Sequence, residues 1–173
     1  MLKGKNIYLR PLLVDDAKSY HEAMKDEEIR HMTRTKNQAS LEEIENHLER
    51  ISKDKSREDY AICRLDSKQM IGELSLLDID LDNRTVGFRI ALSDKKHLNK
   101  GLGSEAINLV IDYVFKVKKL NRLQLEVYSH NKRALRAYEK CGFKKEGILR
   151  QALYYKGNYY DEIIMAIIRD DLD

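Results

Sequence analysis

Residues 101–117 read GLGSEAINLVIDYVFKV, and this stretch decides the architecture of the chain. Its apolar residues recur every three or four positions, at Leu102, Ala106, Leu109, Val110, Tyr113, Val114 and Val117. That spacing is typical of a helix that turns one face toward a protein core. It is the clearest helical pattern in the sequence and predicts a long core-facing helix that ends near Val117.

Predicted strands and further helices lie on both sides of this helix. Alternation of apolar and polar residues predicts strands at 6–10, 60–65, 70–77, 85–92 and 122–128, and a closing hairpin of 143–153 and 159–169. Helices are predicted from a cap at Asp15 or Asp16, from the Ser40 capping box to Ile51, and from Asn131 to Cys141. The order β, α, α, β, β, β, α, β, α, β, β predicts one α/β domain over residues 1–173, with a mixed, mostly antiparallel central sheet flanked by helices.

Composition excludes several classes of function. The 32 Lys and Arg nearly balance the 29 Asp and Glu, leaving a net charge of +3 with both signs interleaved, so no nucleic-acid or membrane partner is expected. No apolar run approaches the roughly 20 residues of a transmembrane helix, and no signal-peptide pattern occurs. Two isolated cysteines predict neither a disulfide framework nor a metal site. We therefore expect a cytoplasmic protein without a metal.

The glycines at the start of the long helix form a candidate anion site. Gly101 and Gly103 follow a short loop after the strand that ends at Leu92. The first amides of a helix have no intrahelical partner and attract negative charge, and Lys100 adds a cation there. The spacing matches neither the dinucleotide GxGxxG motif nor the P-loop.

A second pattern makes the interpretation specific. Strand 122–128 is followed by Asn131, then Ala134, Tyr138 and the pair Gly142-Phe143. This succession resembles the acyl-CoA-binding motif of the GNAT superfamily of N-acetyltransferases, and residues 97–106 resemble its pyrophosphate loop. The predicted element order matches the GNAT (acyl-CoA N-acyltransferase) fold. Residues 125–143 are most similar to ribosomal-protein alanine N-acetyltransferases, and 147–161 to the wider ribosomal-protein N-terminal (alanine/serine) group, although spermidine acetyltransferases share much of the pattern.

The resemblance implies acetyl-CoA as co-substrate. Its pantetheine would pair with the backbone of 88–92, and its pyrophosphate would lie on the amides of 100–104. The residues implied in cofactor binding are Ile90, Leu92, Leu98, Asn99, Lys100, Gly101, Leu102, Gly103, Ser104, Asn131 and Tyr138. Many relatives carry Arg or Gln where this chain has Leu98, which leaves the backbone and Lys100 or Asn99 to hold the pyrophosphate.

Two catalytic residues are implied by the same resemblance. Tyr138 would protonate the departing thiolate. Glu126 occupies the place of the base carboxylate, twelve residues before Tyr138, with Glu73 as the reserve candidate. Many relatives also carry a Glu where Thr85 stands here, so the base role moves to Glu126, Glu73 or a water chain.

The acceptor is expected near residues 28–39 and 154–160. Arg30, His31, Arg34 and Lys36 make the first region basic, which favours a protein N-terminus over a polyamine, because an oligocation needs carboxylates. We therefore expect an N-acetyltransferase that acts by direct attack of a protein N-terminal amine. A small-amine enzyme, for a polyamine or an aminoglycoside, and a catalytically idle acyl-CoA-binding module remain alternatives. The five histidines show no triad or metal spacing, and the resemblance allows a homodimer.

Overall fold

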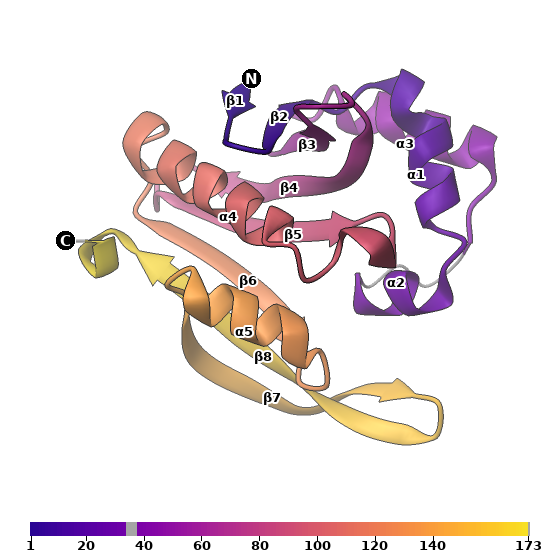
Figure 1. Ribbon diagram of the computed structural model, residues 1–173. Coiled ribbons are helices and arrows are strands. Elements are labelled where there is room, and N and C mark those ends of the chain that lie inside the picture. The colour runs from indigo at the N-terminus through magenta and orange to yellow at the C-terminus, as the bar shows by residue number, and fades with distance from the viewer. Residues whose placement is uncertain (34–37, 173) are drawn as a thin grey trace.

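One eight-stranded sheet organises the computed structural model, which describes residues 1–33 and 38–172. The strands follow the order β1-β2-β3-β4-β5-β6-β8-β7 across the sheet (Figure 1). All neighbours are antiparallel except β5 and β6, which confirms the predicted mixed, mostly antiparallel α/β fold. The strands are β1 Leu2–Lys3, β2 Ile7–Pro11, β3 Glu58–Arg64, β4 Met70–Asp80, β5 Thr85–Leu92, β6 Arg122–Tyr128, β7 Lys144–Tyr155 and β8 Asn158–Ile168.

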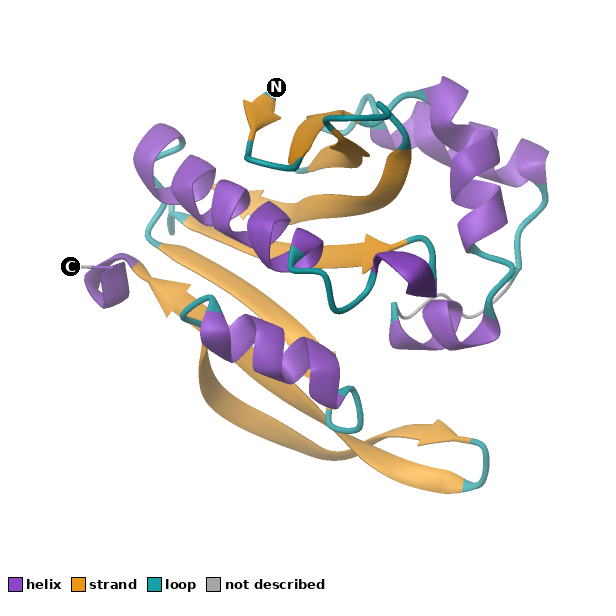
Figure 2. Ribbon diagram, viewed as in Figure 1, coloured by secondary structure: helices purple, strands orange, loops and turns teal. Residues whose placement is uncertain are grey.

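Five α-helices accompany the sheet in the described ranges. They are α1 Ala17–Ala23, α2 Glu27–Met32, α3 Leu41–Ile51, α4 Leu102–Asp112 and α5 Lys132–Lys140. Helices α4 and α5 lie side by side across one face of the sheet, whereas α1, α2 and α3 gather away from them (Figure 2). The main core joins the sheet to α4 and α5, and a smaller apolar cluster lies between α1 and α3. None of the helices described is long and apolar enough to cross a bilayer.

The predicted long helix changes its winding before its end. The α-helical part stops at Asp112, and η3, Tyr113–Val117, continues as a π-helical turn. Its hydrogen bond runs from the Lys118 amide to the Tyr113 carbonyl, five residues back, at 2.9 Å. Val114 and Phe115, which are adjacent in sequence, are both buried in this wider turn.

The N-terminal region differs from the prediction in two elements. Strand β1 has only two residues and α2 only six, and such short elements carry too little periodicity to be recognised in a sequence. Asp16 occupies the predicted N-cap position of α1 but does not cap the helix through its side chain, because both of its carboxylate oxygens accept hydrogen bonds from Arg10 at 2.7 Å.

The parallel pair β5 and β6 separates after three registered positions. Pairing runs from Thr85 opposite Arg122 to Gly87 opposite Gln124, although β5 continues to Leu92 and β6 to Tyr128. Each strand keeps its other neighbour, since β4 accompanies β5 to Leu92 and β8 accompanies β6 to Tyr128. The two strands therefore diverge in the middle of the sheet, beneath the starts of α4 and α5 (Figure 1).

The close approach of β4 to β5 at the diverging end yields a stability prediction. A Cβ on Gly72 would overlap the Ala91 carbonyl oxygen and lie 3.0 Å from the Leu92 Cα, so Gly72→Ala must push the strands apart. We expect a loss of about 1–3 kcal/mol in the free energy of unfolding, measured with urea. Gly103→Ala is the matched control, because its Cβ would meet only Leu92 Cδ1 at 3.8 Å. Equal stability of the two variants would contradict the steric argument.

Candidate active site

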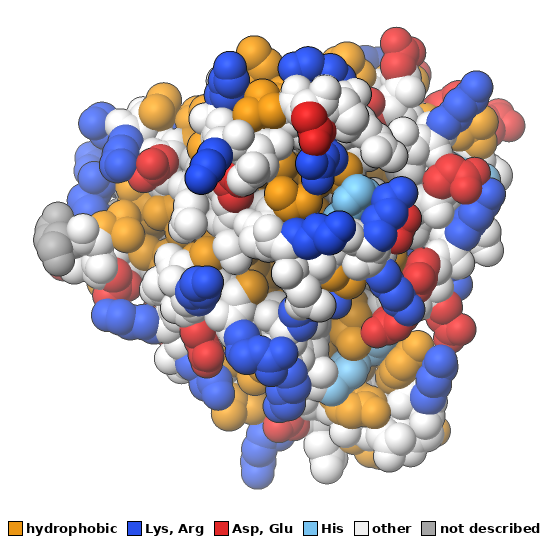
Figure 3. All heavy atoms as spheres, in the orientation of Figure 1, with side chains coloured by type: hydrophobic (Ala, Val, Ile, Leu, Met, Phe, Trp, Pro, Cys, Tyr) orange, Lys and Arg blue, Asp and Glu red, His pale blue; other side chains and the backbone are white. Residues whose placement is uncertain are grey.

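A cavity of about 410 Å³ lies where β5 and β6 diverge. Its walls come from α2, β5, the loop that precedes α4, the first turns of α4, β6 and α5. Lys and Arg side chains are interspersed with Asp and Glu on the face of the molecule that carries α4 and α5 (Figure 3). The cavity wall likewise contains both signs of charge, with Arg89, Lys95 and Arg133 beside Glu28 and Glu126.

The glycine loop forms one end of the cavity. Gly101 takes the left-handed conformation, with φ of 76°, at the start of α4, and no side chain caps that start. Gly103 and Ser104 line the cavity in the first turn of the helix. The unpartnered amides of this turn and the helix dipole make the end suitable for an anion.

Most of the predicted cofactor residues are brought together by the fold. Those that line the cavity are Ile90, Leu92, Leu98, Asn99, Gly103, Ser104, Asn131 and Tyr138. Three residues of the loop do not line it. Lys100 and Gly101 are exposed, and Leu102 is buried in the main core. Lys100 is therefore not in the cavity wall, in contrast to the expectation that it supplies the local cation.

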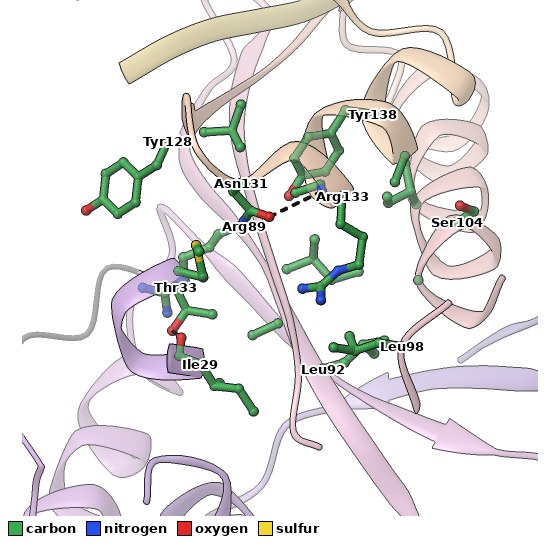
Figure 4. A pocket seen from close by; sticks show the side chains of 18 of the residues that line it. Ile29, Thr33, Arg89, Leu92, Leu98, Ser104, Tyr128, Asn131, Arg133 and Tyr138 are labelled. Carbon is green, nitrogen blue, oxygen red and sulfur yellow. Dashed lines mark hydrogen bonds between the residues drawn. The ribbon is translucent and has the colours of Figure 1, made fainter. Parts of the chain in front are cut away.

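Helix α5 presents a row of residues to the other side of the cavity. Asn131 caps the helix, with its Oδ1 accepting a hydrogen bond from the Ala134 amide at 3.3 Å (Figure 4). Ala134, Ala137 and Tyr138 follow at helical spacing and line the same wall. The Tyr138 side chain projects from α5 toward the cavity (Figure 4).

Tyr138 is a buried phenol in the cavity wall. The residue is 9% exposed. Burial raises the pKa of its phenol to about 12, and the positive charge of Arg133 opposes the rise. The phenol therefore carries its proton at neutral pH.

The two candidate base carboxylates lie in different pockets. Glu126 is exposed on β6 and lines the main cavity. Glu73 lines a smaller neighbouring pocket together with Tyr20, and burial raises its pKa to about 7 against the opposing charge of Arg89. Arg89 Nη2 lies 4.0 Å from the Glu73 carboxylate. Of these two candidates, Glu126 is therefore the one that shares a cavity with Tyr138.

Several cavity residues were not singled out from the sequence. Arg133 extends from α5 toward Leu92 and Leu98 across the cavity (Figure 4), and no carboxylate within the described part of the chain forms an ion pair with it. Arg89, Lys95 and Tyr128 also line the wall. A charged residue in an exposed helix turn or strand carries no sequence signal of the direction in which it points.

The first predicted acceptor region contributes through α2. Glu28, Ile29, Met32 and Thr33 line the cavity. Arg30 does not, because its guanidinium donates hydrogen bonds to the carbonyls of Met24 at 2.5 Å and Lys25 at 3.2 Å. Arg34 and Lys36 lie outside the described residues. The second region, 154–160, contacts α2 but does not line the cavity.

Known proteins with similar sequences and structures are N-acetyltransferases. The probable N-acetyltransferase YjcK of Bacillus subtilis is 34% identical over 99% of this chain and 98% of its own. The spermidine N(1)-acetyltransferase of Escherichia coli K12 is 27% identical over 98% of this chain and 89% of its own. The crystal structure of the Vibrio cholerae spermidine N-acetyltransferase, in complex with CoA and spermine, superposes with a TM-score of 0.90 at 26% identity, over 98% of this chain and 100% of that one.

The family model of the acetyltransferase (GNAT) domain matches residues 6–144, which include β2 to β6, α4, α5 and the whole cavity wall. The family resemblance inferred from 97–106 and 125–143 is confirmed at the level of the superfamily. These relatives are small-amine or uncharacterised acetyltransferases, so they do not support the ribosomal-protein subgroup. The chain belongs to the acetyltransferase (GNAT) domain family and is an N-acetyltransferase.

Proposed function

We propose that this enzyme transfers the acetyl group of acetyl-CoA to a primary amine of a small polycationic molecule of the polyamine type. The observation that carries the proposal is the continuous cavity between β5 and β6. It runs from the first turn of α4 to Tyr138 and has Glu28 and Glu126 in its wall. Relatives aligned over nearly the whole chain act on spermidine, which favours the small-amine alternative over a protein N-terminus.

The donor fits the diverging strands. The backbone of β5 beyond Gly87 has no β6 ladder opposite it, so an extended pantetheine can pair there as an added strand does. Its diphosphate would lie against the amides of Gly103 and Ser104, and Asn131 would hold the pantetheine arm. In this arrangement the thioester would lie beside Tyr138.

The chemistry needs one acid and one base. The neutral amine nitrogen forms a bond to the acetyl carbon, the carbon–sulfur bond breaks, and Tyr138 gives its proton to the leaving thiolate. The attacking nitrogen loses a proton to Glu126, directly or through water. An alkylamine with a pKa near 10.4 costs about 4.6 kcal/mol to deprotonate at pH 7, against about 1.4 kcal/mol for a chain terminus with a pKa near 8. A base therefore matters more for a polyamine.

The charges of the wall are compatible with a cationic acceptor. Lys95 is paired with Glu28 at 2.6 Å and lies 3.7 Å from Asp26, and Arg89 lies against Glu73. Arg30 is directed to backbone carbonyls. Arg133 is the third cation of the described wall and extends toward Leu92 and Leu98, on the side of the cavity proposed for the donor. Of the basic residues that favoured a protein terminus in the sequence, Arg30 and His31 do not line the cavity, and Arg34 and Lys36 lie outside the described residues.

A panel of acceptors tests the proposed substrate class. Purified protein would be incubated with acetyl-CoA and spermidine, spermine, an aminoglycoside, or peptides that begin with Ala or Ser, and CoA thiol release would be measured. We expect spermidine or spermine to give the highest kcat/KM. Preference for the peptides would support the N-terminal alternative. Tight acetyl-CoA binding without thiol release from any amine would show an acyl-CoA-binding module.

Replacement of Tyr138 tests the proposed acid. Tyr138→Phe keeps the ring in the core and removes the phenolic proton, so we expect kcat to fall roughly 10²- to 10⁴-fold. The dissociation constant of acetyl-CoA, measured by calorimetry, should change little. An unchanged kcat would remove Tyr138 from the mechanism.

Arg133 is the cavity-lining cation of α5. Many relatives carry Arg or Gln at the position of Leu98, and we propose that Arg133 contacts the diphosphate in place of that side chain. Arg133→Gln should raise the KM of acetyl-CoA roughly tenfold, the equivalent of one charge-assisted hydrogen bond. The KM of acetyl-pantetheine, which has no diphosphate, should stay unchanged. Arg136→Gln, an exposed residue of the same helix outside the cavity, is the control. Equal effects on both donors would refute a diphosphate contact.

A further inference from the structure

Two histidines that are far apart in the sequence meet beside the cavity. His31 Nε2 of α2 lies 2.8 Å from His130 Nε2, in the loop between β6 and α5. A contact of this kind requires one nitrogen to carry a proton and the other to accept it. Neither histidine belongs to a triad or metal-binding pattern in the sequence, and the fold brings them together across 99 positions of the chain.

Tyrosine rings enclose the histidine pair. His31 stacks on Tyr155 with ring centroids 3.4 Å apart, and His130 lies 4.0 Å from the ring of Tyr160. Tyr128, which lines the cavity, stacks on both imidazoles at 5.3 and 5.8 Å. The pair therefore joins α2, β6 and the β7–β8 hairpin at the acceptor side of the site.

Helix α2 depends on contacts of this kind for its position. Its six residues are too few for a stable isolated helix. One contact joins α2 to the loop between β5 and α4, residues 93–101, which we call the donor loop. In it, the Lys95 ammonium lies 2.6 Å from the Glu28 carboxylate. Toward the β7–β8 hairpin, Glu27 accepts a hydrogen bond from Tyr155 at 3.4 Å and lies 3.4 Å from the Lys156 ammonium. The histidine pair adds a contact with the loop between β6 and α5. Both ends of this cavity wall are therefore anchored by side chains.

The surroundings of the pair disfavour added protons. Burial and the charge of His130 lower the pKa of His31. The charge of Lys156 lowers it further, and Glu27 opposes the shift. Burial and Lys132 lower the pKa of His130. Among the described residues, the phenols of Tyr128, Tyr155 and Tyr160 also face the pair. In addition, the Nδ1 atom of His130 is buried without a hydrogen-bond partner within the described residues.

We propose that His31 and His130 are positioning residues that hold α2 and Tyr128 in the acceptor wall, and that acidification releases this wall. The proposal rests on the function proposed above and deepens it. A single proton leaves one nitrogen able to accept, so the contact survives. A second proton places two imidazolium donors face to face with no acceptor between them. The stabilisation is therefore complete above the ordinary pKa of about 6.5 and is lost as the pH falls through the lowered values.

The test compares the acceptor KM of matched variants from pH 8 to pH 5.5, with spermidine or the best acceptor of the panel. Between pH 8 and pH 5.5, the acceptor KM of the wild type should rise by a larger factor than the acceptor KM of His31→Gln. This variant keeps a polar group near the Nε2 position and cannot titrate. His130→Ala should raise the acceptor KM roughly three- to tenfold at pH 8, with the acetyl-CoA KM unchanged. Protonation of the acceptor amine affects all variants equally, so it cancels in the ratio of the variant KM to the wild-type KM at each pH.

His21→Gln is the control, since this histidine lies on α1, away from the pair. It should keep the wild-type pH profile. Proton–nitrogen NMR of the two rings gives a readout that needs no turnover, and the rings should titrate as a coupled pair below pH 6.5. An identical KM profile in wild type and His31→Gln would overturn the proposal. Independent titration near pH 6.5 would do so as well, even if no amine is acetylated and the proposed function fails separately.

Discussion

The separation of β5 from β6 is the constraint on which the rest of the structure depends. Parallel strands normally pair along their common length, and here the ladder stops after Gly87 although both strands continue. The strands can diverge because each retains a second partner, β4 for β5 and β8 for β6, so the sheet stays intact on both sides of the gap. The opening exposes backbone groups of a central strand to a ligand without exposing the edge of the sheet.

Helices α4 and α5 make this opening chemically useful. Both begin at the gap, so one supplies the amides of Gly103 and Ser104 and the other supplies Asn131 as its cap. The same helices bury their apolar faces in the main core, which fixes their directions. Tyr138 belongs to that core as well as to the cavity wall. Its burial keeps the phenol protonated at neutral pH, so the packing that fixes Tyr138 in the core also fixes its protonation state.

The long, periodic elements were predictable from the sequence because their pattern reflects burial directly. Helix α4, the closing hairpin and the strands of the meander follow from periodicity, and the motifs around Gly101 and Asn131 located the cavity. Helix α2 was not predicted, because six residues do not complete two turns. Arg133 and Lys100 are both cations close to the site in the sequence, and the sequence does not show which of them reaches the cavity. The packing of α5 directs Arg133 into the cavity wall, which Lys100 does not line. The contact of His31 with His130 arises from tertiary structure alone.

The short helix α2 contacts both the donor loop and the loop that precedes α5. Lys95, which pairs with Glu28 of this helix, belongs to the turn that leads into Leu98 and Asn99 of the donor loop. At the other side, α2 is joined through His31 to the loop that precedes Asn131. A helix with little intrinsic stability takes its position from these neighbours, so we expect the loss of either contact to shift the whole helix. The cavity wall is therefore assembled most completely when both of its anchors are in place.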